Sequence, residues 1–98
     1  MRHFIVNLRF TAPSESFGDA VAKHRAYLQE GYDRGLLLMS GPQVPRTGGI
    51  VVARAESLEV LQAFFAKDPY NLNHLAEYTY TEFTPVKYQD WCAEWVQG

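Results

Sequence analysis

The sequence predicts an α+β domain, in which two helices cover one face of a four-stranded antiparallel sheet. Four segments have the two-residue alternation or the short apolar, β-branched runs of strands, and two segments repeat apolar residues every three or four positions. These segments follow one another as strand, helix, strand, strand, helix, strand. With 98 residues, the chain is long enough for one such domain and too short for two.

The first strand is predicted over residues 3–10, where apolar residues alternate with other types. One face carries the apolar side chains of Phe4, Val6, Leu8 and Phe10. The opposite face mixes apolar and polar side chains, among them Ile5, Asn7 and Arg9. This strand therefore has one face suited to a core and one that is only half apolar.

The first helix is expected from about residue 17 to Gly35, with His24 on its apolar stripe. Ser14 or Ser16 can cap it, and Asp19 follows Ser16 by three residues, the spacing of a capping box. Gly35 has the place of a C-terminal glycine.

Two strands follow. Residues 36–40 form an apolar run that ends at Gly41-Pro42, which predicts a strand buried on both faces. Residues 43–49 contain proline and glycines and are expected to form a turn or short loop. The β-branched residues in 50–53 predict the third strand.

The second helix is expected to begin after the cap residue Ser57 and to end at Lys67. Asp68-Pro69 then opens a short helical turn, since Asp is a good cap and Pro suits the first helical position. Alternation of Thr and Tyr over 77–83 predicts the last strand. The order βαββαβ is the ferredoxin-like arrangement.

We expect two parts in the chain, the domain over 1–87 and a helical aromatic tail over 88–98. The six Phe, six Tyr and two Trp exceed what so small a core hides. The surplus is expected on the uncovered sheet face and the tail, chiefly as Tyr78, Tyr80, Trp91 and Trp95. Such a face suits a subunit interface, which predicts a homodimer or higher homo-oligomer.

Composition excludes several function classes. The net charge is −2 and the nine Lys and Arg residues are scattered, which disfavours binding to nucleic acid. No apolar run approaches the length of a membrane span, and no secretory signal pattern opens the chain. The single cysteine, Cys92, permits no internal disulfide. We therefore expect a cytoplasmic protein with no membrane or nucleic-acid partner.

His24 and Asp68 are the candidate catalytic residues. A histidine on an apolar stripe is either a core residue satisfied by a neighbour or a general acid-base group. Asp68 is typical of an ordinary helix cap, but its carboxylate would fix the tautomer of His24 if the two met.

The candidate substrate-binding residues are Ser40, Gly41, Pro42 and Tyr70. Ser40-Gly41-Pro42 is either a plain strand-ending turn or a pocket edge with accessible backbone amides. Tyr78 and Tyr80 could offer hydroxyls, although core packing is the more common use. His and Cys residues lack metal-ligand spacing, and nucleotide-binding loops are missing, so we predict no metal and no cofactor.

Several short motifs in this order resemble the YciI-like family of small bacterial proteins. The motifs are His24 with Tyr27-Leu28, Gly35-Leu36-Leu37-Leu38 before Ser40-Gly41-Pro42, Gly48-Gly49-Ile50, Ser57-Leu58-Glu59 and Asp68-Pro69-Tyr70. The resemblance implies the dimeric α/β-barrel group that includes muconolactone isomerase, and it runs from the first strand to about Phe83. It also implies that His24 and Asp68 form a catalytic dyad.

Three functions stay open. The first is a cofactor-free isomerase or lyase that uses the His-Asp dyad for proton transfer on a small cyclic or enolisable substrate. The second is a binding module for a small ligand, without chemistry. The third is a protein-interaction domain whose Trp91-Trp95 tail docks a partner.

Overall fold

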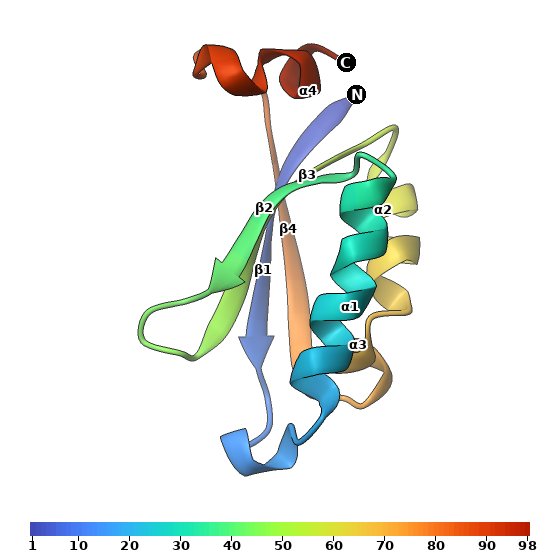
Figure 1. Cartoon of the computed structure of the whole chain (residues 1–98), viewed down its shortest axis with the longest axis vertical. Coiled ribbons are helices and arrows are strands. Elements are labelled where there is room, and N and C mark those ends of the chain that lie inside the picture. The colour runs from blue at the N-terminus through green and yellow to red at the C-terminus, as the bar shows by residue number, and fades with distance from the viewer.

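One antiparallel sheet with the strand order β2-β3-β1-β4 organises the molecule (Figure 1). The computed structural model describes all 98 residues. Its strands are β1 (Arg2–Phe10), β2 (Leu37–Pro42), β3 (Gly48–Ala55) and β4 (Ala76–Phe83). Its helices are α1 (Ala20–Asp33), α2 (Leu58–Ala66), the short α3 (Pro69–Leu72) and α4 (Ala93–Gln97). The predicted ferredoxin-like α+β fold is confirmed.

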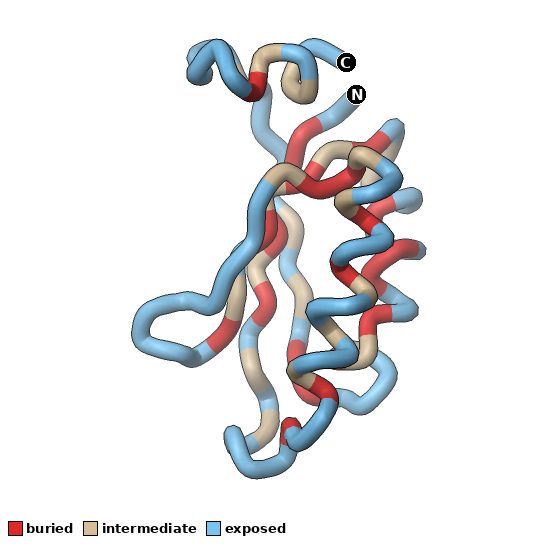
Figure 2. Tube along the Cα trace, in the orientation of Figure 1, coloured by how far each residue is buried: buried red, intermediate tan, exposed pale blue.

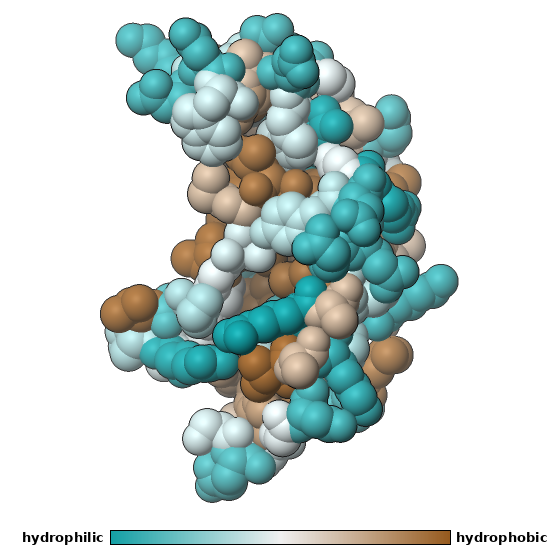
Figure 3. Space-filling view, viewed as in Figure 1, coloured by the Kyte–Doolittle hydropathy of each residue, from teal (hydrophilic) through white to brown (hydrophobic).

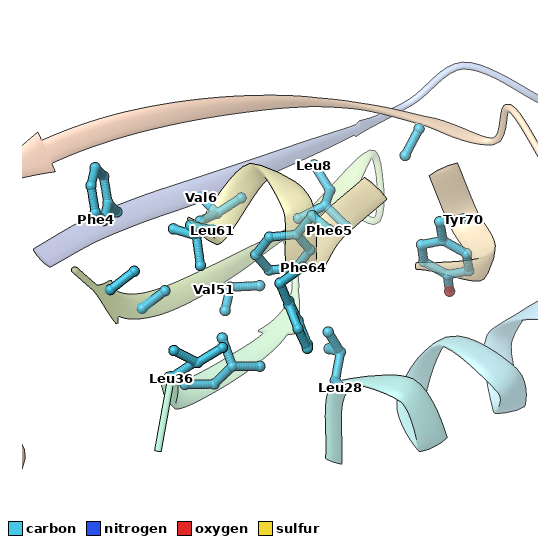
Figure 4. Close-up of a cluster of buried hydrophobic side chains, with 14 of the residues drawn as sticks. Phe4, Val6, Leu8, Leu28, Leu36, Val51, Leu61, Phe64, Phe65 and Tyr70 are labelled. Carbon is cyan, nitrogen blue, oxygen red and sulfur yellow. The ribbon is translucent and has the colours of Figure 1, made fainter. Parts of the chain in front are cut away.

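The core lies between the sheet and the helices α1, α2 and α3, which cover the same face (Figures 1 and 2). Phe4, Val6 and Leu8 of β1 are at most 3% exposed, as the alternation of that strand predicts. They pack with Leu61 and Phe65 of α2 in the cluster drawn in Figure 4. Complete burial of a side chain of this size contributes about 1.5–3 kcal/mol, so this layer holds α2 on the sheet.

The first helix begins later than predicted, at Ala20 instead of near residue 17. Gly18 has a positive φ of 49°, and this left-handed turn separates the serines, which lie in a 3₁₀ turn, from the helix. Neither Ser14 nor Ser16 caps α1, and the cap residue Asp19 makes no capping hydrogen bond through its side chain.

The other end of α1 is as predicted. Gly35 has a φ of 75° and follows the last residues of the helix. The N–H of Gly35 donates to the carbonyl of Tyr32, and the N–H of Leu36 donates to the carbonyl of Gly31, both at 2.9 Å. This pair of bonds is a Schellman motif, which satisfies the final carbonyls of the helix.

The prediction that the strand after α1 is buried on both faces is wrong. β2 is an edge strand, and its residues from Met39 to Pro42 are exposed. Only its beginning, at Leu36 and Leu37, is buried. The apolar run therefore reflects contact with α1 at one end of the strand and not a central place in the sheet.

The expected place of Tyr78 and Tyr80 on the uncovered face is also wrong. In the β1–β4 ladder, Leu8 is opposite Tyr78 and Val6 is opposite Tyr80. Opposite residues of antiparallel strands point to the same face, so both tyrosines lie on the helix-covered side. Tyr80 accordingly packs near the ring of Phe65.

The uncovered face mixes apolar and polar side chains. Ile5 is opposite Val52 on one side and Thr81 on the other, and Asn7 is opposite Ile50. Apolar surface is visible in the hollow between the C-terminal segment and the β2–β3 hairpin (Figure 3).

The C-terminal segment crosses the end of the sheet beside the N-terminus (Figure 1). The ring of Trp95 packs edge-on against the ring of His3, with centroids 5.5 Å apart. Its indole N–H donates to the carbonyl of Gly35 at 3.0 Å, and Arg54 donates to the carbonyl of Trp95 at 2.7 Å. Trp91 remains 69% exposed. None of the helices has the length and apolar character that crossing a membrane requires.

Candidate functional site

His24 and Asp68 meet although 44 positions separate them in the sequence. Nδ1 of His24, on α1, lies 2.7 Å from Oδ1 and 3.0 Å from Oδ2 of Asp68. Asp68 is the N-cap of α3, and its Oδ1 also accepts the backbone N–H of Tyr70 at 3.1 Å. The carboxylate is therefore a helix cap and a partner of the imidazole at once.

Asp68 accepts a hydrogen bond from a third donor that the sequence does not reveal. The hydroxyl of Tyr78, on β4, donates to Oδ2 of Asp68 at 2.6 Å. The Asp68 side chain is fully buried, and buried carboxylate oxygens are costly unless they accept hydrogen bonds. The β1–β4 register is the signal that would have placed Tyr78 on this side, but the register is not evident from alternation alone.

The surroundings of Asp68 keep the neighbouring phenols protonated. Burial raises the pKa of Tyr78 far above its ordinary value, and the Asp68 charge and hydrogen bond raise it further. Burial and then the same carboxylate raise the pKa of Tyr80 to about 12. Tyr78 therefore remains a hydrogen-bond donor to Asp68 throughout the neutral range.

The bond to Asp68 determines which nitrogen of His24 is available. Because a carboxylate only accepts, Nδ1 carries the proton, and in the neutral imidazole Nε2 has the free lone pair. Nε2 makes no hydrogen bond within the chain. His24 is stacked on Tyr70 with ring centroids 3.8 Å apart and planes 5° from parallel, which fixes the ring orientation.

His24 forms part of the wall of a cavity of about 290 Å³ between α1, the sheet and the β2–β3 loop. The cavity is lined by Leu8, Phe10, His24, Arg25, Leu28, Tyr32, Ser40, Gly41, Pro42, Arg46, Gly48, Gly49, Ile50, Val51 and Tyr70. The structure thus gathers His24 and all four candidate substrate-binding residues around one cavity, with Asp68 behind His24. The hydroxyls of Tyr32 and Ser40 are 2.6 Å apart on its wall.

Two arginines at this cavity were not anticipated from the sequence. Arg25 comes from α1, one position after His24, and Arg46 comes from the β2–β3 loop. Burial raises the pKa of the Tyr70 hydroxyl, while the charges of Arg46 and Arg25 lower it. Both arginines therefore line the same cavity as Tyr70. The scattered arginines of the sequence gave no indication that these two converge.

Cys92 lies outside this cavity. Cys92 is buried, and its thiol donates to the carbonyl of Gln89 in the C-terminal segment. No three or more His, Cys, Asp or Glu side chains lie close enough together to hold a metal ion.

Comparison with known proteins identifies the family. Residues 4–84 match the YCII-related domain. A solved structure of 5-chloro-2-hydroxyhydroquinone dehydrochlorinase (TftG) from Burkholderia phenoliruptrix, in complex with 2,5-dihydroxybenzoquinone, has a similar fold, with a TM-score of 0.62. The two chains are 21% identical, and the similarity covers 82% of this chain and 90% of that one. No curated protein sequence matches significantly. Because residues 4–84 match its defining domain, this chain belongs to the family of proteins with a YCII-related domain.

Proposed function

We propose that this protein is a cofactor-independent enzyme that transfers a proton on a small cyclic or enolisable substrate, in an isomerase- or lyase-type reaction. The observation that carries the proposal is the hydrogen bond between Asp68 and His24, whose ring lines the cavity. One nitrogen of His24 is held by a buried carboxylate, and the other has no partner within the chain. This is the arrangement that a general base requires.

In the proposed reaction, Nε2 of His24 removes a proton from a carbon or hydroxyl of the substrate. The electron pair of the broken bond stays on the substrate, as an enolate when the proton leaves carbon and as an enolate or phenolate when it leaves a hydroxyl. His24 becomes an imidazolium, whose charge the Asp68 carboxylate balances. In an isomerisation the imidazolium returns the proton to another atom of the substrate. In an elimination the electron pair of the enolate forms a new double bond, and the leaving group departs with the electron pair of its own bond to the substrate. A well-placed acid-base group of this kind accelerates a reaction by about 10²–10⁴.

The candidate substrate-binding residues have a role at the edge of the cavity. Ser40 and Tyr32 are hydrogen-bonded to one another, so one of the two hydroxyls retains a proton to donate to an enolate oxygen. Gly41 and Pro42 line the same edge with little side-chain bulk. Tyr70 holds the imidazole plane by stacking.

The comparison with TftG supports an enzyme of this type, because a dehydrochlorinase removes a leaving group from a small ring compound. That protein was solved with a small quinone, which supports a small ring compound as the ligand of this fold. The present chain is not assigned the same substrate.

The test is turnover of a panel of small ring acids, lactones and hydroquinones, followed by NMR in D₂O. We expect His24→Ala to fold and to lose about 10²–10⁴ in kcat, with partial rescue by added imidazole. Lys23→Ala is the matched control, because Lys23 is exposed on the same helix and pairs with Asp19 outside the cavity. A folded His24→Ala variant with unchanged turnover would contradict the mechanism. Ligand binding without turnover of any panel member would favour the binding-module alternative.

We also propose that two copies pair through the uncovered face of the sheet. The apolar side chains of Met39, Ile50 and Phe83 are each 40–47% exposed. Exposed apolar surface of this kind is typical of an interface.

A further inference from the structure

We infer that the cavity takes its ligand as an anion, in which Arg25 and Arg46 hold a carboxylate carried by a small ring compound. The inference rests on the proposed function only in placing the ligand in this cavity, and it does not require that the ligand is turned over.

The charges around the cavity are the first observation. Its lining contains Arg25, Arg46 and His24 and no Asp or Glu side chain. Of the nine Lys and Arg residues, only Arg2, Arg9 and Lys23 have carboxylate partners. Arg25 and Arg46 have none, so the charge at this site is uncompensated.

The convergence of the two guanidinium groups is the second observation. They come from different elements, α1 and the β2–β3 loop, and both lower the pKa of the Tyr70 hydroxyl. Two like charges in the lining of one cavity repel one another, and a bound anion between them offsets this repulsion. Asp68 does not line the cavity and forms no ion pair with either guanidinium group, because it is fully buried and already accepts from three donors.

The shape of the cavity selects the remainder of the ligand. Leu8, Leu28 and Val51 line it with apolar surface. A volume of about 290 Å³ is at the small end of ligand pockets, which suits one ring and disfavours a nucleotide. Arginine binds planar carboxylates with two parallel hydrogen bonds, so a ring carboxylate matches both the cationic side and the apolar lining.

The test is the affinity of benzoate, its neutral isostere benzamide and inorganic phosphate, measured by NMR titration or calorimetry on the full chain. We expect benzoate to bind with a millimolar or lower Kd and benzamide at least about tenfold more weakly. Arg25→Gln and Arg46→Gln should each weaken benzoate about 5- to 30-fold and leave benzamide unchanged. Added salt should weaken benzoate only, because the guanidinium groups are reached by solvent.

Lys23→Gln is the matched control, since it removes the same charge from α1 outside the cavity and should leave benzoate binding unchanged. The inference would be overturned by any of three results: equal affinities for benzoate and benzamide, no benzoate binding at millimolar concentration, or a loss of benzoate affinity in Lys23→Gln as large as in the arginine variants. Phosphate that binds as tightly as benzoate would overturn the assignment of a ring compound. Anion-selective binding without turnover of any member of the substrate panel would leave the inference standing and favour the binding module. Turnover of neutral substrates alone would support the enzyme and overturn the inference.

Discussion

Replacing Tyr78 by Phe tests whether Asp68 depends on the donor from β4. The change removes one hydroxyl, whose hydrogen bond to Oδ2 is 2.6 Å long and ends on a fully buried carboxylate. A hydrogen bond to a charged group contributes about 1.5–3 kcal/mol. Because Asp68 keeps His24 and the Tyr70 N–H, we expect a loss of about 2 kcal/mol in the free energy of unfolding at pH 7.

The control is Tyr80→Phe, two positions along the same strand and on the same face. The Tyr80 hydroxyl makes no hydrogen bond in the structure, so its removal should change stability by less than about 0.5 kcal/mol. Urea denaturation followed by circular dichroism measures both variants. Equal losses for the two variants would show that the bond between Tyr78 and Asp68 contributes nothing.

The pH dependence gives an independent test of the same contact. The unfolded state releases the Tyr78 proton near pH 10, the ordinary pKa of tyrosine, whereas the folded state retains it because its pKa is raised. Above pH 10 the unfolded state therefore binds fewer protons, and stability falls by about 1.4 kcal/mol per pH unit for this group. The Tyr78→Phe variant lacks this loss. The stability gap between wild type and variant should narrow as pH rises above 10, and a constant gap would refute the reasoning.

Three further predictions concern the fold and the assembly. Gly31→Ala should lower the free energy of unfolding by about 1–2 kcal/mol in urea denaturation, because the added carbon would lie 2.7 Å from the Phe64 ring. Gly41→Ala is the control and should not destabilise the protein, because the space around Gly41 is open. Equal effects of the two changes would contradict this packing. Val52→Glu should convert a dimer to a monomer in sedimentation velocity, and a monomeric wild type would refute the proposed interface. Trp95→Phe should lose about 1 kcal/mol with its indole hydrogen bond, and an unchanged melting temperature would show that this anchor is dispensable.

The sequence correctly predicts features that depend only on residues close together in the chain, such as the buried face of a strand and the ends of helices. The alternation in β1 predicted its buried face, Ser57 was recognised as the cap of α2, and Gly35 as the glycine after α1. The left-handed turn at Gly18, which delays the start of α1, depends on backbone conformation and not on the spacing of apolar residues.

The sequence predictions are wrong where the structure depends on contacts between distant parts of the chain. An apolar run does not distinguish an edge strand such as β2 from a central one, because only the strand order determines which side is covered. The sequence pattern places Tyr78 and Tyr80 on the wrong face because alternation alone does not give the register of β4 against β1. For the same reason the convergence of Arg25 and Arg46 was not predicted, since they lie on separate elements.

The double role of Asp68 makes natural variation informative. As the cap of α3 alone, this position would accept Asn or Ser with little loss, because these residues cap helices about as well as Asp. Only Asp also supplies the negative charge that faces the imidazole of His24. Relatives that differ here therefore separate the two roles: a homologue with Asn can keep the architecture while giving up the charge. Comparing such homologues would show whether selection at this position acts on folding or on chemistry.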